Sequence, residues 1–295
     1  MSTNIHAEQK PLIYQIGKHV KLVDDATFCK SIIADGKELI TGEEYGAIRV
    51  PELKDEKVYI TFKEDLTSLA NAFSGCSALK SIPENLFANC PKATDFSFTF
   101  FGCKALTAIP EGLFANNPKV TIFQGTFSYC SALKSLPANL FANNRKVNSF
   151  RLTFSGCSAL KSIPENLFAN CPKVNTSFQT FALCKSLKSI PTGLFAHNPE
   201  VTDFSGTFSG CSALESISEK LFANNTKVTN FSYTFKNCSA LIGESPYTMI
   251  DGQKVHLYER ADYPEHFTTP TSTYQAFGNC TGLTDYAQIP TNWKE

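Results

Sequence analysis

Apolar side chains recur along this chain at an interval of 27 positions, and the interval runs without insertion or deletion through seven copies. One column of the pattern is cysteine: Cys76, Cys103, Cys130, Cys157, Cys184, Cys211 and Cys238. Phenylalanine stands three residues before each of these cysteines, from Phe73 to Phe235. A fixed period of this length predicts a solenoid, in which each copy forms one coil and like side chains lie over like.

Two further columns carry phenylalanine on the same period. They are Phe87, Phe114, Phe141, Phe168, Phe195 and Phe222, then Phe96, Phe123, Phe150, Phe204 and Phe231, with Ser177 as the one departure. Each copy thus contains two half-repeats of the form Phe-x-x-Cys/Asn-x-x-Leu/Val-x-x-Ile/Phe. Each half predicts a short helical turn, a buried polar or thiol position and a short extended segment that proline can end. We expect an elongated α/β solenoid of about seven 27-residue coils.

The ends of the chain depart from the period, which suggests three regions. Residues 1–62 alternate polar and apolar positions, with turn signals at Asp35-Gly36 and Thr41-Gly42, and predict a strand-rich N-terminal cap. Residues 63–241 form the solenoid. Residues 242–295 hold an insert and one returning copy of the repeat, with a hairpin turn expected at Asp251-Gly252. Residues 242–273 read either as part of a C-terminal cap or as a separate binding element.

Composition narrows the class of protein. Hydrophobic residues make up 42% of the 295, and 27 basic residues balance 27 acidic ones. The apolar content excludes general disorder, and the zero net charge argues against a nucleic-acid partner. No apolar run is long enough to span a membrane. The first residues, MSTNIHAEQKPLIYQIG, do not combine a basic flank with an apolar core, so we expect no secretory signal in this chain.

Candidate chemistry is sparse. The 11 cysteines lack the clustered pairs that zinc sites use, and stacked columns would hold thiols parallel instead of facing. Cys90 and Cys171 stand where other copies have asparagine, so cysteine is interpreted as a buried space-filler, while Cys29 lies outside the columns. No phosphate-binding loop, dinucleotide fingerprint or nucleophile elbow occurs. We therefore expect no catalytic residue, no metal site, no cofactor and no enzyme activity.

Charged residues form stripes on the same period. Lysines recur at 80, 134, 161 and 188, and again at 92, 119, 146, 173 and 227; glutamates recur at 84, 111, 165 and 219. Catalysis by a pair of acids requires one carboxyl pKa to be higher than the other, and stacked glutamates in identical environments would have similar pKa values. Solvated surface stripes are therefore expected. The lysines leave open a site for an anionic glycan.

Three columns vary freely between copies, and all flank the extended VTxF segment. Stacking would bring them onto one face, where large apolar, planar and Arg side chains are usual anchors of recognition. The candidate partner-binding residues are Phe98, Ile122, Gln124, Arg151, Leu152, Gln179 and Tyr233. The alternative is neutral variation at solvent positions. Phe178 could also fill the core by a one-residue slip, because Ser177 stands where the column has phenylalanine.

The repeated segment VTxFxxTFxxCxxLxxIP, seen from Val201 to Ile217 with Ser218 in place of the proline, resembles the BspA-like leucine-rich-repeat surface proteins of Bacteroides-type bacteria. The resemblance covers residues 63–241, and more weakly 274–293, and departs from the commonest forms in its period and its LFANN segment. It implies a right-handed leucine-rich-repeat stack, surface exposure and a role in adhesion or partner binding. It names no ligand.

The function expected is that of a non-enzymatic, surface-exposed module that binds a protein or glycan on a host, matrix or bacterial surface. We expect a monomer, located at the cell surface or outside the cell. One alternative is a phage virion or tail-associated receptor-binding protein, because virion proteins need neither a signal nor an anchor. Another is a structural spacer, and a hydrolase is the weakest alternative.

Overall fold

The computed structural model describes residues 10–39 and 46–295. Within these residues six strands precede the repeats: β1 (Leu12–Tyr14), β2 (Gly17–Val23), β3 (Cys29–Ala34), β4 (Lys37–Glu38), β5 (Ile48–Leu53) and β6 (Lys57–Phe62), with a 3-10 turn η1 (Ala26–Phe28). The expected turn at Asp35-Gly36 joins β3 to β4, with φ of 49° and 70°. The turn expected at Thr41-Gly42 lies outside the described residues.

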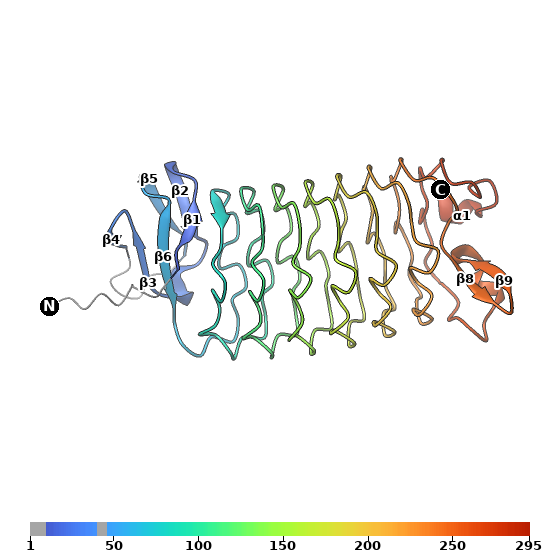
Figure 1. Ribbon diagram of the computed structural model, residues 1–295, viewed down its shortest axis with the longest axis horizontal. Helices are drawn as coiled ribbons and strands as arrows, with labels where there is room; N and C mark the ends of the chain where they lie inside the picture. Colours follow the sequence, from blue (N-terminus) through green and yellow to red (C-terminus); the bar gives the residue numbers. More distant parts are fainter. Residues whose placement is uncertain (1–9, 40–45) are drawn as a thin grey trace.

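The N-terminal strands join the first coil through the sheet itself. A five-stranded sheet has the order β4-β3-β6-β1-β7, and β7 (Leu79–Ser81) belongs to the first repeat. Strand β1 pairs with it antiparallel, with Ile13 opposite Ser81. Strands β2 and β5 form a separate pair. This strand-rich region therefore lies against one end of an elongated stack (Figure 1).

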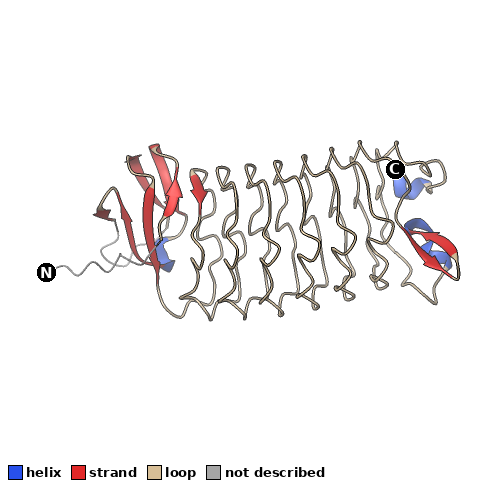
Figure 2. Ribbon diagram, viewed as in Figure 1, coloured by secondary structure: helices blue, strands red, loops and turns tan. Residues whose placement is uncertain are grey.

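Successive coils lie side by side along the stack, joined by parallel bridges at the same position of every copy (Figures 1 and 2). The bridged residues are Ser68, Asp95, Ile122, Ser149, Thr176, Asp203, Asn230 and Ser272. Neighbours in this series are 27 residues apart, except for Asn230 and Ser272, which are 42 residues apart. The sequence period therefore becomes a spatial period, as leucine-rich-repeat-type folds require.

The expected helical turns are not helices, and the α/β description is wrong for the repeats. Between residues 63 and 242 the structure has turns, isolated bridges and the one short strand β7. The backbone shows why. The N–H groups of Phe127 and Tyr129 donate to Thr153 and Ser155 of the next coil, at 2.9 and 2.6 Å, and those of Ser128 and Cys130 donate three residues back within the turn. Because alternate donors leave for the neighbouring coil, no helix can propagate.

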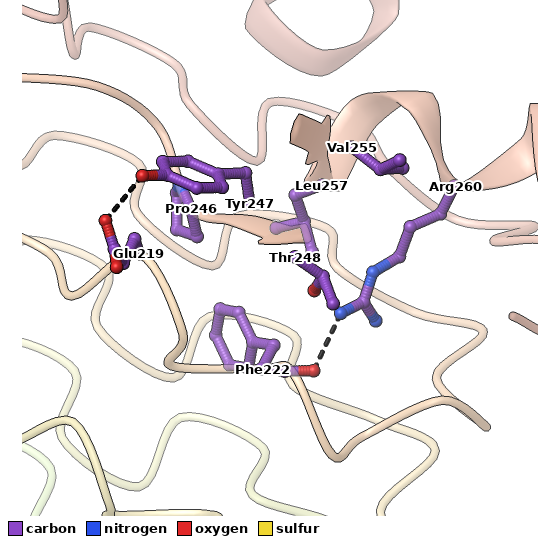
Figure 3. A pocket seen from close by; sticks show the side chains of 8 residues that line it. All are labelled: Glu219, Phe222, Pro246, Tyr247, Thr248, Val255, Leu257 and Arg260. Carbon is purple, nitrogen blue, oxygen red and sulfur yellow. Dashed lines mark hydrogen bonds between the residues drawn. The ribbon is translucent and has the colours of Figure 1, made fainter. Parts of the chain in front are cut away.

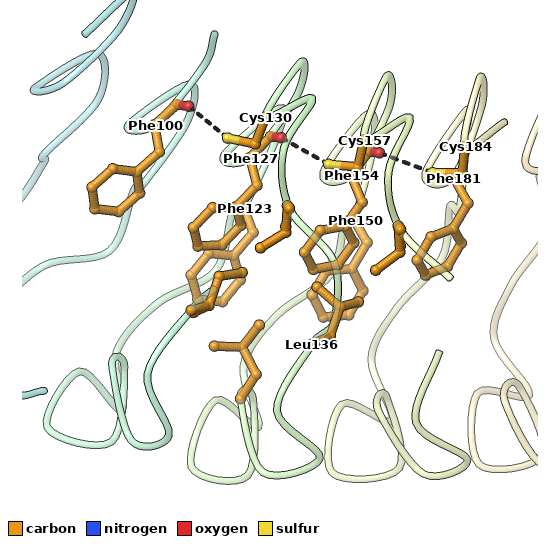
Figure 4. Close-up of a cluster of buried hydrophobic side chains, with 14 of the residues drawn as sticks. Phe100, Phe123, Phe127, Cys130, Leu136, Phe150, Phe154, Cys157, Phe181 and Cys184 are labelled. Carbon is orange, nitrogen blue, oxygen red and sulfur yellow. Dashed lines mark hydrogen bonds between the residues drawn. The ribbon is translucent and has the colours of Figure 1, made fainter. Parts of the chain in front are cut away.

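The core consists of phenylalanine rings stacked from coil to coil (Figure 4). The rings of Phe127 and Phe154 lie 5.7 Å apart and within 2° of parallel. Ser177 is buried at the interrupted position and bonds the Thr180 hydroxyl at 2.9 Å, while Phe178 lies partly exposed outside the core. The one-residue slip is therefore wrong: the core accepts the smaller serine in register.

Buried cysteines form a second column, and they do more than fill space. The Cys130 thiol donates to the carbonyl of Phe100 at 3.2 Å, and Cys157 does the same to Phe127. Figure 4 shows these bonds running from coil to coil. Each of these carbonyls also accepts from a backbone N–H of its own turn, and the thiol supplies a weak second donor.

Asparagines form a parallel column in the other half-repeat. The Asn144 side chain donates to the carbonyls of Phe114 and Asn117, at 3.4 and 2.9 Å. In the next coil the Cys171 thiol faces the equivalent carbonyls of Phe141 and Asn144, at 3.9 and 3.5 Å. The Asn/Cys interchange thus preserves a donor to the same two carbonyls.

After the repeats come β8 (Tyr247–Ile250), β9 (Gln253–His256), the 3-10 turn η2 (Leu257–Asp262) and α1 (Thr291–Lys294). The hairpin predicted at Asp251-Gly252 joins β8 to β9, with φ of 49° and 80°. The returning repeat enters the stack: the ring of Phe277 lies 5.5 Å from that of Phe235. Buried Trp293 covers Phe277 and Phe231, at 6.1 and 6.0 Å.

The insert ends the asparagine column with an arginine. Arg260 is buried, and its guanidinium donates to the carbonyls of Asn225 and Phe222, at 2.9 and 2.7 Å. Figure 3 shows the bond to Phe222. These carbonyls correspond to the two that asparagine, or Cys171 in one coil, contacts earlier in the stack. Burial lowers the pKa of Arg260 to about 9, so it stays charged at neutral pH.

Candidate functional site

Two columns of residues follow the outer edge of the TFxxC turn. The first outer column comprises Asn71, Phe98, Gly125, Leu152, Gln179, Gly206, Tyr233 and Gln275. The second outer column comprises Gly75, Gly102, Tyr129, Gly156, Leu183, Gly210, Asn237 and Asn279. Every residue in both has a φ between 50° and 75°. Glycine takes this left-handed conformation freely, whereas other residues carry about 1–2 kcal/mol of strain.

The turn imposes this conformation. At each of these positions that has a following coil, the N–H group donates to that coil, as the 2.8 Å bond from Phe98 to Gln124 and the 2.7 Å bond from Leu183 to Ser209 show. Several glycine positions could hold no side chain in the present packing. A Cβ on Gly125 would lie 2.4 Å from the Phe98 ring, and one on Gly156 would lie 2.7 Å from the Tyr129 ring. Large side chains therefore lie over a glycine of the following coil.

These columns form an open groove on one face of the stack. Its lining residues are Phe98, Phe101, Ser128, Tyr129, Leu152, Ser155, Gln179, Ala182, Leu183 and Ser209. Tyr129 and Leu183 are 47% and 39% exposed, and together with the other apolar side chains that line the groove they form an exposed apolar patch. The rings of Phe101 and Tyr129 meet edge to face at 5.6 Å.

Of the seven predicted binding residues, the groove brings together Phe98, Leu152 and Gln179. Ile122 is a bridge residue of the stack, and Gln124 lies beside it without lining the groove. The Arg151 guanidinium lies 3.9 Å from the centre of the Phe178 ring. Tyr233 lies farther along the stack, where its ring meets that of Tyr274 at 5.4 Å. The structure thus places three of the seven residues in the groove, Arg151 and Tyr233 in two separate surface pairs, and Ile122 and Gln124 in neither.

Sequence reasoning missed Phe101, Tyr129 and Leu183. The sequence does mark two of them. The second residue after the phenylalanine of TFxxC is glycine in four of the seven consecutive copies from Gly75 to Asn237. Tyr129 and Leu183 are the large apolar departures from glycine there. In both cases glycine stands 27 residues later, at Gly156 and Gly210, where the side chain needs room.

The thiols offer no reactive site. All 11 cysteines are buried and unpaired, including Cys29 in β3. Burial raises the pKa of the Cys157 and Cys211 thiols to about 12, so they remain protonated and unreactive at neutral pH. No cluster of metal-ligating side chains occurs among residues 10–39 and 46–295.

A serine, a histidine and an aspartate meet in the C-terminal region without forming a catalytic triad. Ser245 is fully buried, and its hydroxyl lies 2.5 Å from Asp285 Oδ2 and 2.9 Å from His256 Nδ1. Catalysis by a serine requires an accessible oxygen whose proton goes to the histidine. Here the hydroxyl donates to the carboxylate, so the cluster fastens the β8–β9 hairpin to the returning repeat.

The charged stripes are exposed and partly paired between coils. Lys188 contacts Glu215 at 3.1 Å, and Lys227 contacts Glu200 at 2.7 Å, each pair 27 residues apart. Exposed pairs contribute little to stability. In the part of the chain that the structure describes, no helix has the length and apolar content to cross a bilayer.

Comparison with known proteins gives one family and several distant structures. Residues 56–229 match the model of the BspA type leucine rich repeat region, in six copies. No curated protein sequence matches. Among solved structures, the APL1 leucine-rich repeat domain has 18% identity over 48% of this chain and 38% of its own length, with a TM-score of 0.34. A leucine-rich repeat protein from Bacteroides ovatus ATCC 8483 has 20% identity over 65% of this chain and 72% of its own, with a TM-score of 0.17.

Proposed function

The chain belongs to the BspA-type leucine-rich-repeat family, and from this and the groove we propose that it is a non-enzymatic recognition module that binds a protein or glycan partner. Leucine-rich-repeat proteins generally bind partner proteins, and members of this family are typically surface-associated. The proposed location is therefore the cell surface, with the groove turned toward the partner.

The observation that carries the proposal is the residue choice at the strained outer positions. Tyr129 and Leu183 adopt φ of 58° and 60°, although glycine occupies the equivalent position in neighbouring coils. Glycine would relieve the strain, and it would also remove exposed apolar surface. Strain that stability does not require is characteristic of functional sites. We take these side chains to be kept for what they bind.

The two ends have a supporting role in this proposal. We infer a solenoid over residues 63–241, closed by an N-terminal cap over 1–62 and by a C-terminal insert and capping repeat over 242–295. The pairing of β1 with β7 and the carbonyl contacts of Arg260 support this division. Terminal coils would otherwise expose an apolar face. On this division residues 242–273 belong to the cap, not to a second binding element.

The proposal is tested with the double variant Tyr129→Gly and Leu183→Gly, which copies the residue of neighbouring coils. We expect its melting temperature to equal or exceed that of the native chain, because left-handed strain is relieved. Binding to an array of matrix proteins and glycans should be lost. The control variant Lys134→Ala, in an exposed stripe outside the groove, should bind as the native chain does.

Two results would contradict the proposal. If the native chain binds no probe of the array, a structural spacer becomes the better account of the stack. If the glycine variant binds as well as the native chain, the recognition surface lies elsewhere, and the Tyr233–Tyr274 and Arg151–Phe178 pairs become the next candidates.

A further inference from the structure

The groove lining has a composition that restricts the ligand. Its ten residues include aromatic rings, aliphatic groups, serines and one amide, and no carboxylate, ammonium or guanidinium. The lysine stripes do not line it. An ionic ligand would therefore find no opposite charge within the groove, while a neutral one would leave no buried charge unpaired.

Polar groups in the groove are free to bind a ligand. Within the described structure, the side-chain amide of Gln179 makes no hydrogen bond. The side-chain hydroxyls of Ser155, Ser209 and Tyr129 make none either. Apolar and aromatic walls with a few unpaired polar groups are typical of small-ligand and sugar sites. The free groups include both donors and acceptors, which match the hydroxyls of a carbohydrate.

The backbone argues against an extended peptide. Adding a strand to an edge requires free N–H and C=O groups, which give this mode its affinity. Here the N–H of Tyr129 donates to Ser155, that of Gly156 to Ala182 and that of Leu183 to Ser209, at 2.6–2.7 Å. The groove therefore offers a peptide backbone few free N–H partners. A carbohydrate needs none, because it carries its own hydroxyls and presents an apolar C–H face to a ring.

From these observations we propose that the groove binds a neutral carbohydrate chain, with Tyr129 as the stacking residue and Gln179, Ser155 and Ser209 as hydrogen-bonding groups. This inference rests on the proposed recognition function. The lining residues extend from Phe98 to Ser209 over successive coils, so the site suits several linked sugar units rather than one.

The test is affinity electrophoresis of the full chain in native gels that contain mannan, xyloglucan, amylose or a β-glucan. We expect retardation in at least one of these neutral gels. Tyr129→Ala should weaken it by about two- to tenfold, because the aromatic contact is lost. Tyr129→Phe, which keeps the ring and loses the hydroxyl, should weaken it less. Lys134→Ala should have no effect.

A gel with heparin and the matrix-protein array distinguish the remaining outcomes. Retardation in heparin alone would overturn the inference and indicate the lysine stripes. Binding of a matrix protein that requires Tyr129, without retardation in any neutral gel, would overturn the carbohydrate inference and leave the recognition function intact. Failure of every probe would overturn both. Neutral-gel retardation unchanged in Tyr129→Ala would place the sugar site elsewhere and overturn the inference.

Discussion

Single residues repeat along this chain because each coil must supply hydrogen-bond donors to the carbonyls of the coil before it. Threonine, cysteine and asparagine do so at fixed positions. The Thr153 hydroxyl donates to the Phe123 carbonyl at 2.9 Å, the Cys157 thiol to that of Phe127 at 3.2 Å, and the Asn144 side chain to that of Asn117 at 2.9 Å. Each of these carbonyls also accepts from a backbone N–H of its own turn, so the side chain supplies its second donor. Their recurrence is thus a requirement of the backbone as much as of packing.

The asparagine column can be tested by exchange. Asn144→Cys should change the free energy of unfolding by less than about 1 kcal/mol, because Cys171 already serves this role and because the Asn144 side-chain oxygen is buried without a partner. Asn144→Ala should cost about 1–3 kcal/mol, because two hydrogen bonds of about 0.5–1.5 kcal/mol each are lost while both carbonyls keep a backbone donor. Urea unfolding measures both, and an alanine variant as stable as the native chain would contradict this role.

The phenylalanine columns give a larger effect. Phe154 is fully buried between Phe127 and Phe181, with ring centroids at 5.7 and 5.5 Å. Phe154→Ala should destabilise the protein by about 3–5 kcal/mol, because it opens a cavity in a central coil that cannot collapse. Calorimetry or urea unfolding would show it. Phe178→Ala is the matched control, and its cost should be smaller because that ring is partly exposed.

At the scale of the element, each repeat is built on a turn in which every second backbone N–H group donates to the next coil. This arrangement forces the two outer columns into the left-handed region and thereby creates the outer face. It also leaves the last coil with carbonyls that no further coil can bind. Arg260 of η2 reaches two of them, so the insert completes a pattern that the repeat itself cannot finish.

Replacing Arg260 tests this closure. Arg260→Met keeps an apolar stem, but the Asn225 carbonyl loses its donor, and the Phe222 carbonyl keeps only the backbone N–H of Asn225. We expect a loss of about 3 kcal/mol, because bonds from a charged donor contribute about 1.5–3 kcal/mol each. Hydrogen exchange should show faster opening of residues 243–270, while the central coils keep their protection. Arg260→Lys should recover part of the loss, and equal exchange in all three proteins would contradict the role.

In the whole molecule, stacking buries one thiol from every copy, and burial shifts the pKa of these thiols in the same direction. The ordinary thiol pKa is near 8.5–9, and burial raises that of Cys157, Cys211 and Cys280 to about 12. Between these values the folded chain binds more protons than the unfolded chain. Stability is therefore fully present below about pH 8.5 and falls as the pH rises.

This dependence is measurable as a urea midpoint that is constant from pH 7 to 8 and falls between pH 9 and 10. Each fully buried thiol contributes a slope of about 1.4 kcal/mol per pH unit in that window. A Cys157→Val variant lacks one titrating group and should show a shallower decline than the native chain. A midpoint independent of pH from 7 to 10 would show that the thiols are not buried as a set.

Much of the fold could be predicted from the sequence. The columns of Phe73, Cys76 and their successors, the turn at Asp35-Gly36, the hairpin at Asp251-Gly252, and the return of the repeat at Phe277 all follow from local pattern. Each depends on residues that recur or on short-range turn chemistry. The helical turns were mispredicted because a single sequence does not show that alternate N–H groups bond to another coil.

The candidate site was predictable only in part, for a physical reason. The sequence by itself determined which positions repeat, and hence the stack, because like side chains must fit over like in every coil. It did not determine which variable side chains meet: Phe98 and Tyr129 converge because one turn aims two columns the same way and glycines at 125 and 156 leave them room. Nor did it indicate that Arg260, outside the period, replaces asparagine at the end of the stack. Contacts between columns depend on the direction of each turn, and only the tertiary structure decides that direction.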